Sequence, residues 1–178
     1  MTILNIKRPH VVYEHHFSDY LIDGLNEDGI QHNKYIPIES KKLFKFGHSA
    51  RLIIGIMENY LLDGFKSTLV DYRVVDLKAG DCGCKLDNWH IDVVRNPNHK
   101  SRPDRHLIFS TIIGTEFIDE PLECNTDDFS DINTNDVAIW SAPVNSIVIY
   151  NRFHLHRGPI VKEDCRRVLI RITQTDVF

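Results

Sequence analysis

Two short stretches of this 178-residue sequence carry side chains that bind metal ions. The first holds His90 and Asp92, which are separated by one residue. On an extended strand, residues two apart point to the same face, so an imidazole and a carboxylate would stand side by side. The second holds His156, more than sixty residues later. If His156 reaches the same point, two histidines and one carboxylate hold one face of a metal ion and leave three coordination positions open.

The identity of the second histidine has two solutions. His154 and His156 would share one face of a strand, so either could complete the set. We favour His156, because Arg166 and Arg167 follow it by ten and eleven residues. In addition, Gly158 and Pro159 turn the chain directly after it. A single histidine among ten is more often a surface or core residue, so the hypothesis depends on the combination.

The order of these residues along the chain forms a sparse pattern: His90-x-Asp92, then His156, then an arginine ten or eleven residues later. In this pattern, over roughly residues 68–173, the chain resembles the Fe(II)/2-oxoglutarate-dependent dioxygenase superfamily, whose core is a double-stranded β-helix. The resemblance implies that His90, Asp92 and His156 bind Fe(II), and that Arg166 or Arg167 binds the distal carboxylate of 2-oxoglutarate.

The resemblance also implies a reaction. Molecular oxygen and 2-oxoglutarate would be consumed, succinate and carbon dioxide released, and a C–H bond of the substrate hydroxylated. The chain lacks the paired glycines before Glu-Thr of prolyl-hydroxylase-like members and the longer arginine-rich ending of the nucleic-acid demethylases. The substrate therefore stays open among small molecules, peptide side chains and nucleobases.

The arginines can be ranked by strand alternation. On a strand predicted over 166–173, Arg167 and Arg171 share one face, whereas Arg166 belongs with the apolar side chains of the other face. A guanidinium is a planar fork that pairs with a carboxylate through two hydrogen bonds. We therefore expect Arg167 to bind the co-substrate; the alternative is that these arginines face solvent on an edge strand.

Further candidates surround this set. Tyr72, together with Asn88 and Ser110, is a candidate to orient a ligand or to contact the co-substrate. A polar loop at 95–104 follows the first ligands. Basic residues in and directly after it, Arg102 and Arg105, are candidates to bind an anionic substrate. A solvated loop without function is the alternative.

The expected architecture is mainly β with a flanking α-helix, specifically a double-stranded β-helix of the jelly-roll, cupin-like type in a single domain, 1–178. Apolar residues at three- and four-residue intervals predict a helix over about 49–65, capped by Ser49, within an N-terminal flanking segment 1–67. The core, 68–173, should hold seven or eight strands without a β-α-β order. Expected strands are 68–77, 85–94, 106–118, a pair at 137–140 and 145–150, and 166–173.

Composition excludes some classes. The net charge of −4 does not indicate nucleic-acid binding, and no apolar run predicts a membrane span. The absence of a signal peptide favours a cytoplasmic protein, in which Cys82, Cys84, Cys124 and Cys165 would be free thiols. Two other functions stay open: a cupin-type metal protein that does not use 2-oxoglutarate, and a non-catalytic jelly-roll binding or structural protein.

Overall fold

The computed structural model describes residues 2–4, 7–13, 17–82, 89–92, 103–124 and 136–177. The helical elements are α1 Asp19–Asn26, the 3-10 helix η1 Lys41–Lys45 and α2 His48–Glu58. The strands are β1 Thr2–Leu4, β2 His10–Tyr13, β3 Gln31–Pro37, β4 Ser67–Leu77, β5 Arg105–Ser110, β6 Glu116–Ile118, β7 Leu122–Cys124, β8 Ile139–Ser141, β9 Ile147–Asn151, β10 His156–Arg157 and β11 Cys165–Thr175. The predicted mainly-β class with helices in the N-terminal part is confirmed.

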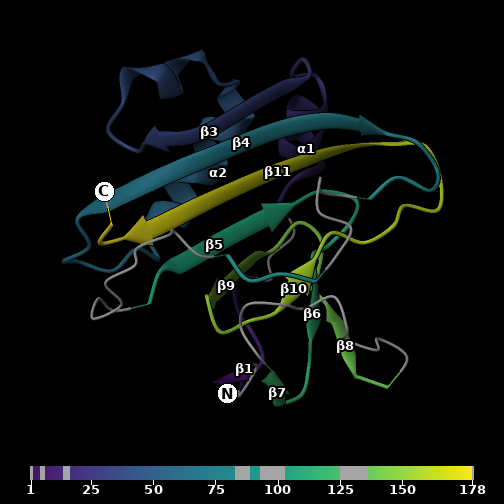
Figure 1. The fold of residues 1–178 in the computed structure, drawn as a ribbon. Helices are drawn as coiled ribbons and strands as arrows, with labels where there is room; N and C mark the ends of the chain where they lie inside the picture. The colour runs from purple at the N-terminus through teal and green to yellow at the C-terminus, as the bar shows by residue number, and fades with distance from the viewer. Residues whose placement is uncertain are drawn as a thin grey trace.

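The strands form three antiparallel sheets. The largest has six strands in the order β2-β9-β5-β11-β4-β3, a second has the order β10-β6-β8, and β1 pairs with β7. The longest pairing joins β11 to β4 in unbroken register from Cys165–Leu77 to Thr175–Ser67. Figure 1 shows β3, β4, β11 and β5 running side by side, with the helices behind them and β6, β8 and β10 away from that layer.

The two faces of the large sheet differ in chemistry because side chains alternate along each strand. On β11, Val168, Ile170 and Ile172 are fully buried in a core with residues of α1 and α2. The alternate residues Arg167, Leu169 and Arg171 point to the other face. That face, called the polar face below, carries charged side chains beside a second apolar cluster that includes Ile108, Val148 and Leu169, and the site is built there.

Helix α2 is shorter than predicted. It starts at His48 after Gly47 and ends at Glu58, and Ser49 is buried instead of capping the helix. Ser49 packs against Gly24 of α1, where an added Cβ would lie only 2.3 Å from the serine hydroxyl oxygen. At the other end, the side-chain amide of Asn59 donates to the carbonyls of Gly55 and Ile56 and caps the helix where it ends. The apolar periodicity beyond residue 58 belongs to turn residues that still pack on the core.

The expected strands also differ from the structure in extent and in pairing. The predicted strand 106–118 is two strands, because the chain bends at 111–115, where Ile112 has φ 54°, and crosses from the large sheet to the second sheet. The predicted pair 137–140 and 145–150 is wrong: β8 pairs with β6, and β9 pairs with β2 and β5. Of the predicted strand 85–94 only residues 89–92 are described, and they form one isolated bridge at His90.

Neither described α-helix has the length and apolar run that crossing a bilayer requires.

Candidate metal centre

The site begins with a backbone bridge between two histidines. The His90 amide donates to the His156 carbonyl, and the His156 amide donates to the His90 carbonyl, both at 2.9 Å. This reciprocal pair fixes the two residues opposite each other. Their ring centroids lie 4.4 Å apart. Main-chain hydrogen bonds thus bring together residues that are separated by more than sixty positions.

Asp92 completes the set. Its Oδ2 lies 3.4 Å from Nε2 of His156, close to the distance of about 3 Å between neighbouring ligands of a cation held at about 2.1 Å. One ligand atom from each of His90, Asp92 and His156 lies within 4.8 Å of the other two. The convergence expected from the sequence is therefore present. Two imidazoles and one carboxylate suit Fe(II) and other divalent transition metals.

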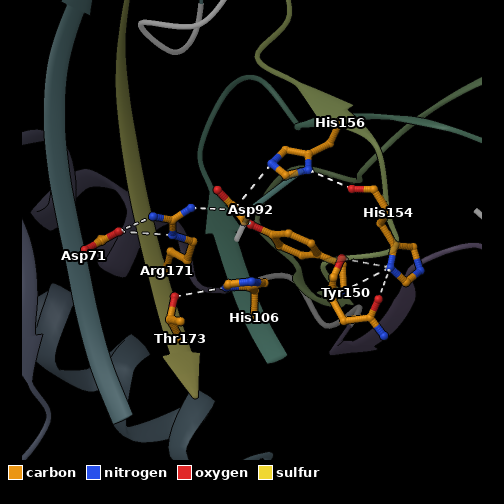
Figure 2. A network of polar contacts seen from close by, with 9 residues as sticks. Asp71, Asp92, His106, Tyr150, His154, His156, Arg171 and Thr173 are labelled. Carbon is orange, nitrogen blue, oxygen red and sulfur yellow. Dashed lines mark hydrogen bonds and ion pairs between the residues drawn. The ribbon is translucent and has the colours of Figure 1, made fainter. Parts of the chain in front are cut away.

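The backbone also sets the tautomer of His156. Its Nδ1 lies 3.0 Å from the His154 carbonyl oxygen, which can only accept a hydrogen. Nδ1 therefore carries the proton, and the lone pair of Nε2 faces Asp92. The His154 ring turns away, with Nδ1 against Asn151. Figure 2 shows these two rings on opposite sides of their connecting chain. The choice between the two histidines thus follows from the turn before β10.

Asp92 is held by two further side chains. Its Oδ2 accepts hydrogen bonds from the Tyr150 hydroxyl at 2.6 Å and from Nη1 of Arg171 at 2.5 Å. The guanidinium of Arg171 is held in turn by Asp71, which is 2% exposed (Figure 2). Burial alone would raise the pKa of Asp92, but nearby positive charge, chiefly that of Arg171, outweighs burial and keeps that pKa well below its usual range. Asp92 is therefore an anion ready to bind a cation.

Burial acts in the opposite direction on Tyr150. It raises the pKa of the phenol well above its usual value, and the negative charge of Asp92 adds to the effect. Tyr150 therefore stays protonated, and its hydroxyl donates a hydrogen bond to the Asp92 carboxylate. Its ring also packs edge-on against His156, with centroids 5.0 Å apart. This one residue contacts two members of the candidate set.

A third histidine lies beneath this layer. His106 is 2% exposed, stacks on Tyr150, and places Nδ1 3.0 Å from the Thr173 hydroxyl. Burial lowers the pKa of His106 to about 4. His106 is therefore neutral at pH 7. It supports Tyr150 and does not belong to the metal-ligand set.

His90, Asp92, His156, Tyr150 and Arg171 line a cavity of about 230 Å³ on the polar face of the large sheet. Its walls contain His90, Asp92 and His156, apolar and polar side chains from β5, β9 and β11, and four cationic residues: Lys34, Arg73, Arg167 and Arg171. A larger hollow of about 500 Å³ lies at the outer edge of the sheet between β3 and the start of β4. None of His90, Asp92 and His156 lines that hollow. The smaller cavity is therefore the one that contains the candidate metal ligands.

Arg167 and Arg166 are separated as strand alternation predicts. Arg167 is 2% exposed, lines the cavity, and donates from Nε to the Ser110 hydroxyl at 3.0 Å. Arg166 lies on the other face, where it pairs with Asp76 and reaches the Asn26 carbonyl. The structure therefore leaves Arg167 and not Arg166 as a residue that can meet a ligand in this cavity. Ser110 positions that arginine.

Other candidates lie elsewhere. Tyr72, a candidate for contact with the co-substrate, is on the helix face of β4, fully buried, with its hydroxyl bonded to Asp28. It cannot reach the cavity, because adjacent strand residues face opposite sides. Arg105 binds the Gln174 side chain at 3.0 Å and does not line the cavity. Asn88 and Arg102 lie outside the described residues.

The sequence did not single out Asp71 or Tyr150, and it indicated His106 only as part of a basic cluster that could meet an anionic substrate. Asp71 lies between the core residues Val70 and Tyr72, so alternation alone could have placed it on the polar face. Which strands are neighbours, and therefore which of these side chains meet, depends on long-range pairing.

No family model matches this chain, and no curated protein matches it significantly in sequence.

Proposed function

We propose that this protein is an Fe(II)- and 2-oxoglutarate-dependent oxygenase that hydroxylates its substrate. The observation that carries the proposal is the convergence of His90, Asp92 and His156 in a cavity that a buried arginine, Arg167, also lines. The six-stranded and the three-stranded sheet both contribute residues to this cavity, which supports a double-stranded β-helix as the core architecture. When bound, Fe(II) and 2-oxoglutarate supply the oxidative decarboxylation that drives hydroxylation.

The residues of this chain have separate tasks in that reaction. His90, Asp92 and His156 would hold the metal on one face, which leaves positions for the keto acid and oxygen. Tyr150 and Arg171 keep Asp92 in place and ionised. Arg167 would bind the distal carboxylate of 2-oxoglutarate as a charged, two-toothed donor, since Ser110 already orients its Nε edge.

The test is an anaerobic titration of Fe(II) followed by 2-oxoglutarate, recorded as the visible charge-transfer band of the metal chelate. The wild-type protein should develop the band, and a variant with both His90→Ala and Asp92→Ala should not. Arg167→Gln should weaken 2-oxoglutarate binding at least tenfold. Arg166→Gln is its matched control, because the neighbouring arginine lies on the opposite face, and it should leave the affinity unchanged.

Each alternative gives another result. A protein that binds Fe(II) through the three residues but shows no band at saturating 2-oxoglutarate is a metal protein without this co-substrate. A protein that binds no divalent metal with measurable affinity is not an oxygenase of this kind. Either result rejects the proposal.

A further inference from the structure

The cavity contains more positive charge than the proposed co-substrate requires. Among the described residues, four cationic side chains line it, and Asp92 is the one carboxylate in its lining. Arg171 is already paired with Asp71 and Asp92, and Arg167 is the residue assigned to 2-oxoglutarate. Arg73 and Lys34 are left. We propose that Arg73 and Lys34 bind a carboxylate or phosphate group of the molecule that is oxidised, so that the substrate is a small anion; this rests on the proposed function.

Arg73 reaches the cavity through the alternation of β4. Its neighbours Tyr72 and Val74 are fully buried in the core on the helix side, so Arg73 points to the polar face. In the sheet it lies directly opposite Leu169 of β11, which also lines the cavity. Arg73 therefore stands beside the row that carries Arg167 and Arg171.

Lys34 and its neighbour Tyr35 both line the cavity, which a regular strand does not allow for adjacent residues. The register of β3 against β4 shifts between Asn33 and Ile36, and Tyr35 has φ 53°. The Tyr35 amide donates to Oδ1 of Asp71 at 2.7 Å and fixes this irregularity. Such a bulge re-aims side chains at a strand edge. Here it brings Lys34 to the wall of the cavity.

Arg73 lacks the partners that other arginines of this protein have. It is half-buried, its Nε is inaccessible to solvent, and within the described part of the chain its side chain makes no hydrogen bond or ion pair. By contrast, Arg157 pairs with Glu116 and Arg166 with Asp76. A partly buried cation without a counter-charge is costly, and a bound oxyanion would offset that cost through charge-assisted hydrogen bonds.

The strand order sets the distance between this pair and the metal ligands. Arg73 lies on β4, and Tyr150, which contacts Asp92 and His156, lies on β9, three positions away in the order β9-β5-β11-β4. Three strand spacings amount to about 14 Å. A molecule anchored on Arg73 can therefore extend toward the metal ligands past Arg171 and Leu169. The cavity of about 230 Å³ is below the range of about 300–1,000 Å³ of drug-sized sites, which favours a small molecule.

The test uses inorganic phosphate and acetate as probes on metal-free full-length protein, so that neither anion can bind through a metal. Amide NMR signals of Lys34, Tyr35 and Arg73 are followed during titration at constant ionic strength. We expect saturable shifts, with at least fivefold weaker binding in Arg73→Gln and in Lys34→Gln. Arg166→Gln, which removes an arginine on the opposite face, should bind the probe as the wild type does. The anion that binds more tightly identifies the substrate group.

Several results would overturn the inference. These are no saturable binding of either anion, binding that is unchanged in Arg73→Gln, or binding that is lost only in Arg167→Gln. A loss of 2-oxoglutarate binding in Arg73→Gln but not in Arg167→Gln would assign Arg73 to the co-substrate and also overturn it, while leaving the oxygenase proposal standing. Conversely, Arg73-dependent phosphate binding in a protein that forms no Fe(II)–2-oxoglutarate band supports the anion site and rejects the oxygenase.

Discussion

Nη1 of Arg171 lies 2.5 Å from Oδ2 of Asp92, so a buried cation faces a carboxylate of the candidate metal centre. The same guanidinium contacts Asp71 on the neighbouring strand, directly opposite in register. Arg171 thus links the sheet to the segment that carries His90 and Asp92. The position of this metal-ligand candidate is set by an ion pair as well as by the backbone.

Replacing Arg171 should cost stability through the carboxylate it leaves behind. Arg171→Met leaves Asp71, 2% exposed, without its cation, and breaking a buried pair in this way costs about 3–5 kcal/mol. The free energy of unfolding from urea titration measures the loss. The double variant with Asp71→Leu should recover part of it, because Asp71 then no longer leaves a buried carboxylate without its cation. A single variant as stable as the wild type would show that the pair is not buried as described.

Tyr150→Phe should weaken metal binding while preserving the fold. The change removes the hydroxyl that donates to Asp92 at 2.6 Å but keeps the ring that packs on His106 and His156. Loss of such an outer partner lowers metal affinity by about 10- to 100-fold. Competition with a chromogenic chelator gives the affinity. Tyr20→Phe, at a position 75% exposed, is the control and should bind metal as the wild type does; equal affinities for all three proteins would contradict the prediction.

The two neighbouring histidines should behave differently when replaced. His156→Ala removes a nitrogen that faces Asp92 and should reduce metal affinity at least 100-fold. His154→Ala keeps the backbone carbonyl that holds His156 and removes only a ring bonded to Asn151, so affinity should change less than threefold. Calorimetric titration with Zn(II) measures both. If His154→Ala causes the larger loss, the assignment of His156 is wrong.

Stability should fall with pH in a window set by His106. Its pKa is about 4 in the folded protein and about 6.5 when unfolded. Between these values the unfolded chain binds more protons, so stability decreases as pH falls from about 6.5 to about 4, by about 3 kcal/mol in all. Urea unfolding of metal-free protein across this range measures the slope. Burial also lowers the pKa of His154, so the test is the difference between wild type and His106→Phe, whose slope should be smaller. Identical slopes would count against a neutral, buried His106.

The sequence alone was sufficient for features that depend on local alternation. Arg167 and Arg171 share a face of β11 and Val168, Ile170 and Ile172 share the other, because side-chain direction in a strand repeats every two residues whatever the strand pairs with. The placement of His90 and Asp92 on one side of the chain follows in the same way from their two-residue spacing. The mainly-β class follows from many short apolar runs separated by turns.

Features that depend on which segments are neighbours were decided only by the tertiary structure. Tyr72 faces the helices because β4 lies between β11 and β3 with that side covered, and β8 pairs with β6 and not with β9. The end of α2 at Glu58 came from an asparagine that caps carbonyls, not from the loss of apolar periodicity. Asp71, Arg171, Asp92 and Tyr150 meet because three strands and one bridged segment converge. Such convergence is a property of long-range pairing, which no local pattern in the sequence encodes.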